Sequence, residues 1–140
     1  MASQTFRNDY DGYWREVNSR GLPSSSGVYT VYECTFNKGK DTVSIHKKIY
    51  IGEAGNIKER IENHEKKEDW LEHVRKGNTL CYNAAHVDAT YRERVEAALI
   101  FEHEPPENEE YTDSFPFDTT TIKTMGNNKY LKDQFIIQSV

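Results

Sequence analysis

Two runs of β-branched and aromatic residues, separated by a short polar segment, constrain the fold of this chain most. The first run covers residues 28–32 and consists of Val, Tyr and Thr, and the second covers residues 43–51 and is rich in Ile. The segment between them contains Asn37, Gly39 and Asp41, which are residue types that favour turns. The pattern predicts a β-hairpin with a loop longer than the two-residue minimum.

Helical signals follow this hairpin. Asn56 and Glu59 match a capping box, which predicts a helix that begins just after Asn56. Thr90 and Glu93 form a second capping box, and the helix they predict is stopped by the prolines at 105 and 106. Between these helices, residues 69–77 predict a short helix and residues 79–87 predict a third strand.

The two ends of the chain have weaker patterns. Four apolar residues at helical spacing predict an N-terminal helix: Tyr10, Tyr13, Trp14 and Val17. Residues 119–124 predict a strand, and residues 135–137 are expected to complete the core.

Together these elements predict one α+β domain over residues 1–140. Its centre is a small antiparallel three-stranded sheet flanked by helices. Residues 1–25 form an N-terminal helical extension, and residues 109–140 form a C-terminal loop and strand extension.

Composition excludes several classes of protein. The 140 residues are 36% hydrophobic and 12% aromatic, which is enough apolar material for one core. No apolar run approaches the ~18 residues that a membrane span requires, so the prediction is a cytoplasmic protein without membrane association. Cys34 and Cys81 lack metal-ligand spacing and are expected to be reduced thiols in or near the core.

Charge is distributed unevenly along the chain. The formal net charge is -5, which disfavours a surface that grips phosphate everywhere. Residues 38–76 nevertheless hold ten Lys or Arg against eight acids, whereas residues 102–118 hold seven acids and no Lys or Arg. A locally basic face and an ordinary mixed surface are both compatible with this distribution.

Two tripeptides resemble the signature of a known nuclease family. Gly27-Val28-Tyr29 on the first predicted strand and Tyr50-Ile51-Gly52 on the second are similar to the two halves of the GIY-YIG motif, with Val in place of the first Ile. The resemblance covers residues 26–108 and extends to further residues in the family's order: Ala54, Asn56, Ile57, Arg60, His64, His73, Glu96 and Asn108.

The resemblance implies a metal-dependent endonuclease that hydrolyses phosphodiester bonds in DNA. Glu96 would bind one Mg²⁺ or Mn²⁺ ion, and Arg60 would stabilise charge on the phosphate. Tyr29 would be the general base, and Tyr50 would position water or phosphate. The resemblance assigns supporting roles to Gly52, Asn56, His73 and Asn108.

The identity of the base stays open among Tyr29, His64 and a metal-bound hydroxide. A phenol with a pKa of about 10 must lose roughly 2.5 pKa units, or about 3.4 kcal/mol, to act near neutral pH. His64 needs no such shift, and it lies one helical turn after Arg60. Glu53 would either add a metal contact or weaken phosphate binding.

A second class of function also fits the sequence: a catalytically inactive module with the same resemblance that binds nucleic acid or a protein partner. The net charge of -5 is consistent with such a module. Because the chain has no zinc finger, helix-turn-helix signature or basic tail, target selection by an enzyme would require a homodimer, a targeting partner or the N-terminal helix.

Overall fold

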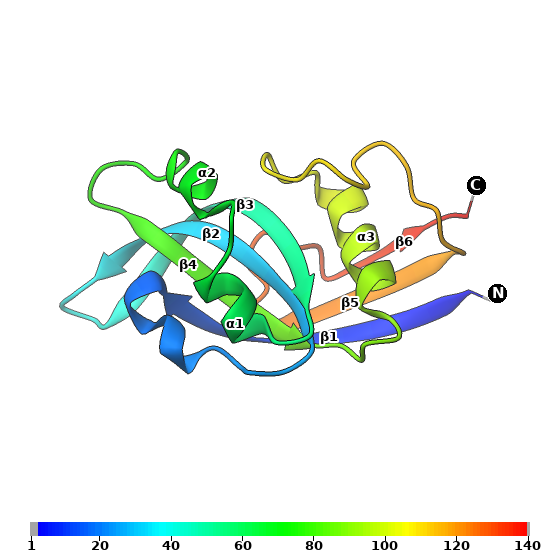
Figure 1. Cartoon of the computed structure of the whole chain (residues 1–140), viewed down its shortest axis with the longest axis horizontal. Helices are drawn as coiled ribbons and strands as arrows, with labels where there is room; N and C mark the ends of the chain where they lie inside the picture. Colours follow the sequence, from blue (N-terminus) through cyan, green and yellow to red (C-terminus); the bar gives the residue numbers. More distant parts are fainter. Residues whose placement is uncertain (1–2, 140) are drawn as a thin grey trace.

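The computed structural model describes residues 3–139, which form one six-stranded mixed sheet curved into a half-barrel (Figure 1). The sheet order is β3-β2-β4-β1-β5-β6. The strands are β1 (Gln4–Arg15), β2 (Gly27–Asn37), β3 (Thr42–Ala54), β4 (Thr79–His86), β5 (Thr120–Gly126) and β6 (Gln134–Ile137). The helices are η1 (Glu16–Gly21), a 3-10 helix, and the α-helices α1 (Ile57–Glu62), α2 (Lys67–Leu71) and α3 (Arg92–His103).

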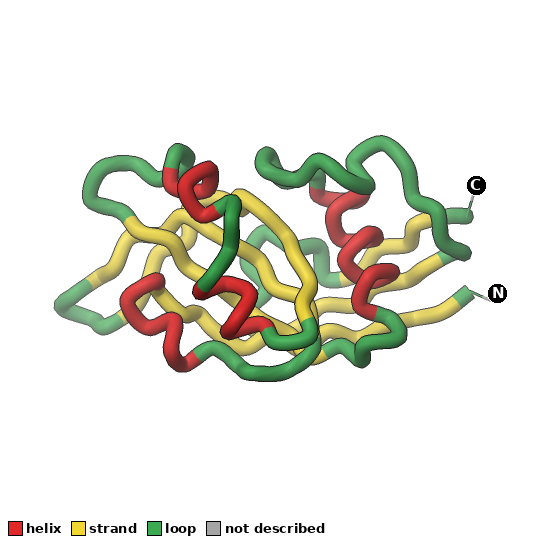
Figure 2. Tube along the Cα trace, in the orientation of Figure 1, coloured by secondary structure: helices red, strands yellow, loops and turns green. Residues whose placement is uncertain are grey.

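The predicted fold, a small three-stranded sheet flanked by helices, is wrong. Strands β2, β3 and β4 exist, and β2 pairs antiparallel with both β3 and β4, but β1, β5 and β6 extend the sheet. Strand β1 pairs antiparallel with β4 and parallel with β5, which makes the sheet mixed. Helices are short segments on a body made mainly of strands (Figure 2).

The predicted N-terminal helix is strand β1 followed by η1. In β1, Asn8 and Tyr10 are buried while Arg7, Asp9 and Asp11 are exposed, which is the period of a strand. One inward position is the polar Asn8, so the alternation of apolar and polar residues is hidden in the sequence. Backbone pairing with β4 and β5 outweighs the helical spacing, because a short helix is only marginally stable by itself.

The β2–β3 hairpin forms as predicted. Its ends pair at Asn37 and Thr42, and its register shifts at two points along the strands. Asp41 has a positive φ of 52°, which Asp tolerates in turns. The two strands that leave this turn carry the two tripeptides, Gly27-Val28-Tyr29 on β2 and Tyr50-Ile51-Gly52 on β3.

The helix boundaries follow local capping only in part. Asn56 caps α1, since its side chain accepts a hydrogen bond from the Glu59 backbone at 3.0 Å. The predicted capping box at Thr90 is wrong: Tyr91 is the N-cap of α3 and makes no side-chain capping bond. None of the helices in residues 3–139 is both long enough and apolar enough to cross a bilayer.

The core consists of three clusters that meet at the sheet. α3 packs on the cluster containing Val28 and Ile51, whereas α1 and α2 pack on the cluster containing Tyr29 and Ile57. The hairpin therefore contributes to both clusters. α1 and α3 lie on either side of the end of β3 (Figure 1).

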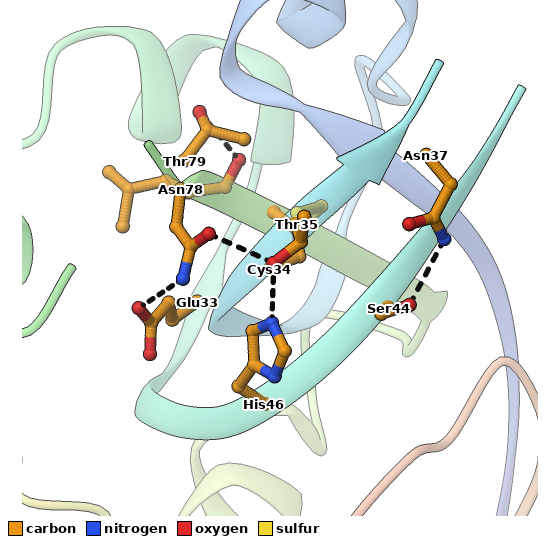
Figure 3. The surroundings of a disulfide bond; sticks show 10 residues. Glu33, Cys34, Thr35, Asn37, Ser44, His46, Asn78 and Thr79 are labelled. Carbon is orange, nitrogen blue, oxygen red and sulfur yellow. Dashed lines mark hydrogen bonds between the residues drawn. A yellow bond between two sulfur atoms is a disulfide. The ribbon is translucent and has the colours of Figure 1, made fainter. Parts of the chain in front are cut away.

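The third cluster surrounds a disulfide between Cys34 and Cys81, which corrects the prediction of reduced thiols. Both cysteines are fully buried, and their Cα atoms are 6.1 Å apart. Beside the disulfide, Asn78 links Glu33 to Thr35, and the Thr35 hydroxyl contacts His46 (Figure 3). Burial by itself would raise the pKa of Glu33, but hydrogen bonds from Asn78 and Arg75 lower it to about 2.

Candidate active site

Side chains from separate elements converge on one open pocket of about 270 Å³. The pocket lies where the β2–β3 hairpin, α1, α3 and the segment after α3 meet. It contains five of the residues that the sequence singled out: Tyr29, Tyr50, Arg60, Glu96 and Asn108.

The two tyrosines come from neighbouring strands. Tyr29 on β2 is almost fully buried, and its ring centroid lies 6.4 Å from that of Tyr50 on β3. Gly52 makes this arrangement possible, because a Cβ at that position would overlap the Tyr29 hydroxyl. The predicted supporting role of Gly52 thus has a steric reason: it leaves room for the Tyr29 ring.

Burial raises the pKa of both tyrosines. Desolvation is the main cause, followed by Tyr50 for Tyr29 and by Glu96 for Tyr50. The pKa of Tyr50 rises to about 12, and that of Tyr29 lies well above its usual value of 10.0. Arg60 opposes these increases for both rings but does not overcome them.

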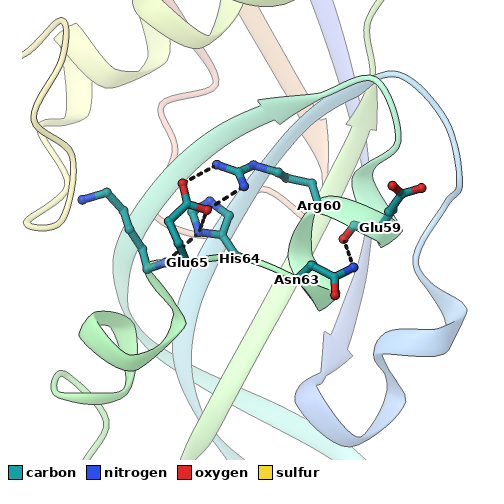
Figure 4. A network of polar contacts seen from close by, with 6 residues as sticks. Glu59, Arg60, Asn63, His64 and Glu65 are labelled. Atoms are coloured by element: carbon teal, nitrogen blue, oxygen red, sulfur yellow. Dashed lines mark hydrogen bonds and ion pairs between the residues drawn. The ribbon is translucent and has the colours of Figure 1, made fainter.

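Arg60 projects from α1 and is bound by a carboxylate (Figure 4). Its Nη1 and Nη2 atoms donate to the two carboxylate oxygens of Glu65 at 2.7 and 3.0 Å. The Asn56 cap starts α1 four residues earlier, and this cap places Arg60 one turn along the helix. Arg60 also lines an adjoining open pocket of about 460 Å³, so it stands between the two cavities.

Glu96 lines the pocket from α3, together with Glu93 near the start of the same helix. The pKa of Glu96 is raised to about 8, mainly by burial and then by the nearby carboxylates of Glu53, Glu110 and Glu93, in that order of importance. Around Glu96, the pocket therefore carries more acidic side chains than its Lys and Arg side chains neutralise.

This surplus of negative charge fits a bound divalent cation. A cation would relieve the repulsion around Glu96, and Mg²⁺ is commonly held by one or two carboxylates with water and substrate oxygens completing its shell. Across residues 3–139, no three His, Cys, Asp or Glu side chains are grouped closely enough to hold a metal ion by themselves.

Asn108 attaches the segment after α3 to the edge of the sheet. Its side-chain amide accepts from the Ile51 backbone N–H and donates to the Ile51 carbonyl, each at 2.9 Å. The neighbouring Glu107 backbone N–H donates to the Ile49 carbonyl at 3.0 Å. These bonds close one wall of the pocket and cover the edge of β3.

The two predicted histidines lie outside the pocket. The His64 side chain has 0% exposure, and its ring packs against the tilted Trp70 ring and edge-on to the Tyr50 ring, with centroids 4.4 and 5.3 Å away. Burial and Arg60 lower its pKa to about 4. His73 Nε2 instead pairs with Glu107 at 2.6 Å, which ties the end of the α2 segment to the pocket wall.

Several pocket residues were not singled out from the sequence. Glu53 was considered in the sequence as either a metal contact or a hindrance to phosphate binding. In the structure it pairs with Arg92 at 2.6 Å, which neutralises part of its charge. The segment after α3 brings other side chains, for which the only sequence signal was its excess of acids. The further lining residues are Lys66, Glu93, Ile100, Glu109, Glu110 and Tyr111.

Comparisons with known proteins give no match to this chain. No protein-family model matches it, and neither a curated protein nor a solved structure matches it significantly.

Proposed function

We propose that this protein is a metal-dependent endonuclease that hydrolyses phosphodiester bonds in DNA. The observation that carries the proposal is the convergence of Tyr29, Tyr50, Arg60 and Glu96 on one pocket. These residues are far apart in the chain, and the resemblance to the GIY-YIG family selects all four of them. Their chemistry also meets the needs of phosphodiester hydrolysis, namely a cation site, a phosphate-binding guanidinium and polar groups that orient water.

Arg60 and Tyr50 bind and orient the phosphate in this proposal. The guanidinium of Arg60 presents two parallel donors, which match two oxygens of a phosphate group. Tyr50 keeps its proton because its pKa is raised to about 12, so its hydroxyl donates a hydrogen bond to a phosphate oxygen.

Glu96 would hold one Mg²⁺ or Mn²⁺ ion. The bound cation would supply positive charge that stabilises the phosphoryl oxygens and lowers the pKa of a nearby hydroxyl or water. Glu53 lies close to Glu96, but its pairing with Arg92 makes it a supporting charge rather than the main ligand.

Tyr29 is the better candidate for the general base than His64. Tyr29 lines the pocket, whereas the buried His64 ring packs against Tyr50 and does not line it. Burial raises the pKa of Tyr29, so Tyr29 holds its proton until positive charge enters the pocket. This dependence makes the reaction strictly metal-dependent in our proposal.

Plasmid nicking tests the proposal directly. Purified protein is incubated with supercoiled DNA in Mg²⁺ or Mn²⁺, with an EDTA control and the Glu96→Gln variant. We expect nicking or linearisation with metal, none in EDTA, and a loss of at least about 100-fold in rate for the variant. Glu96→Gln replaces a buried carboxyl that mostly keeps its proton near neutral pH by a neutral amide of similar size, so the variant should melt no lower than the wild type.

Glu102→Gln is the matched control on the same helix. Glu102 pairs with Lys132 and does not line the pocket, so its loss should leave nicking unchanged. If the folded wild type never cuts DNA but binds it in a salt-sensitive way, the protein is a binding module and not an enzyme. The rate would be equal in Glu96→Gln and wild type only if the cation site lies elsewhere.

A further inference from the structure

We propose that Glu65 acts as an internal competitor for the phosphate-binding site on Arg60, so that a substrate phosphate binds by displacing the Glu65 carboxylate. This inference rests on the proposed function, because it concerns the regulation of the same site. It assigns Glu65 a role in setting substrate affinity rather than in the chemistry.

The contact occupies the donors that a phosphate would use. Both terminal nitrogens of Arg60 bind Glu65, at 2.7 and 3.0 Å, in the two-pronged geometry that arginine also uses for phosphate (Figure 4). A phosphate cannot engage the same pair of donors while Glu65 is bound. The carboxylate is thus a stand-in for the substrate group.

The segment that carries Glu65 is anchored by its neighbours. The buried His64 ring fixes the position before it, and His64 Nδ1 accepts from the Lys66 backbone N–H at 3.1 Å. The Lys67 backbone N–H donates to the His64 carbonyl at 3.3 Å. These hydrogen bonds therefore hold the backbone on both sides of Glu65 in place.

The Glu65 side chain can leave Arg60, because its other close ionisable neighbour is the buried His64 ring, whose Nδ1 lies 3.7 Å from Glu65 Oε2. Its side chain is 66% exposed, so the released carboxylate can be hydrated without crossing the core. Arg60 is 39% exposed and lines both neighbouring pockets, so it keeps access to an incoming ligand. Exchange requires only rotation of one side chain about a fixed backbone.

The charge of the ligand decides the exchange. An exposed carboxylate–arginine pair is weak, whereas a phosphodiester that also contacts a cation at Glu96 gains further interactions in the same pocket. A single anion without those contacts competes with Glu65 on nearly equal terms. Glu65 therefore raises the threshold for binding and favours ligands that fill the whole site.

A double-mutant cycle tests this competition. Binding of a fluorescein-labelled duplex DNA is measured in EDTA by anisotropy for wild type, Glu65→Gln, Arg60→Ala and the double variant. Glu62→Gln is the control, because Glu62 lies on α1 and pairs with Lys58. This substitution removes the same charge as Glu65→Gln without removing a contact to Arg60. We expect Glu65→Gln to bind two- to fivefold more tightly than Glu62→Gln, the range expected of an exposed ion pair.

The excess should vanish when Arg60 is absent. If Glu65→Gln and Glu62→Gln bind equally, or if the excess persists in the Arg60→Ala background, the competition does not exist. Failure of both wild type and Glu65→Gln to bind DNA also overturns it. If the protein cleaves DNA but Glu65→Gln binds no more tightly than Glu62→Gln, the proposed nuclease activity holds and the competition does not. If Glu65→Gln binds more tightly but no variant cleaves, the competition holds and the nuclease activity does not.

Discussion

Burial decides the protonation of His64 and removes it as a base. Its ring is enclosed by Trp70 and Tyr50, and a charged imidazolium there would lose its hydration. The spacing from Arg60 predicted a shared helix face, and this prediction is wrong, because α1 ends at Glu62 and His64 turns into the core. A residue type suited to acid–base chemistry is here a packing residue.

The low pKa of His64 predicts a pH dependence of stability. The unfolded chain binds this proton with a pKa of about 6.5 and the folded protein with a pKa of about 4. Between these values the unfolded state binds more protons, so stability falls as the pH falls from 6.5 towards 4, by about 2 kcal/mol at pH 5. Denaturant unfolding of wild type and His64→Phe at pH 7 and pH 5 measures this component. An equal loss in both proteins would assign the pH dependence to other groups.

Gly52 predicts a steric effect on activity. Gly52→Ala places a methyl group against the Tyr29 hydroxyl, so Tyr29 must move. We expect the nicking rate to fall at least about tenfold and the free energy of unfolding to fall by about 1–3 kcal/mol. Gly39→Ala is the control, because a Cβ there meets nothing within 4 Å. Equal rates for both variants would remove Tyr29 from the site.

Helix capping distinguishes two sequence motifs that look alike. Asn56 caps α1, whereas Thr90 lies before a helix whose N-cap makes no side-chain bond. Asn56→Ala should therefore cost about 1 kcal/mol of unfolding free energy, and Thr90→Ala less than about 0.5 kcal/mol. Thermal or denaturant unfolding of the two variants compares them directly. A larger loss for Thr90→Ala would contradict the helix start at Arg92.

Strand pairing explains which elements were predictable. The β2–β3 hairpin and α1 follow from local patterns, since the turn and the cap lie within a few residues of the elements they start. β1 has partners about 75 and 115 residues away along the chain, at Ala85 and at Thr120 to Gly126. No local pattern shows these pairings, so the helical spacing of Tyr10, Tyr13 and Trp14 was misleading.

The disulfide joins two neighbouring strands whose cysteines are far apart in the sequence. Cys34 on β2 and Cys81 on β4 are 47 residues apart, and the loop between them contains α1, α2 and Arg60. Closing a loop of this length restricts the unfolded chain by about 3–4 kcal/mol. Reduction is therefore expected to affect the whole fold rather than one segment.

Double substitution by alanine checks this expectation. The Cys34→Ala/Cys81→Ala protein should unfold with about 3–4 kcal/mol less free energy than oxidised wild type. Dithiothreitol should lower the stability of the wild type towards that of the variant and leave the variant unchanged. If the reductant has no effect on the wild type, the two cysteines are not joined in solution.

Local patterns in the chain were enough to predict the hairpin and the α1 cap, and the family resemblance singled out five of the residues that line the pocket. The side-chain chemistry of Tyr29, Tyr50, Arg60 and Glu96 can be seen directly from the sequence. The six-stranded sheet, the disulfide, the burial of His64 and the Glu65–Arg60 contact arise only in the folded molecule. Pairing of distant strands and removal of side chains from water depend on every neighbour in space, and the order of residues along the chain does not show those neighbours.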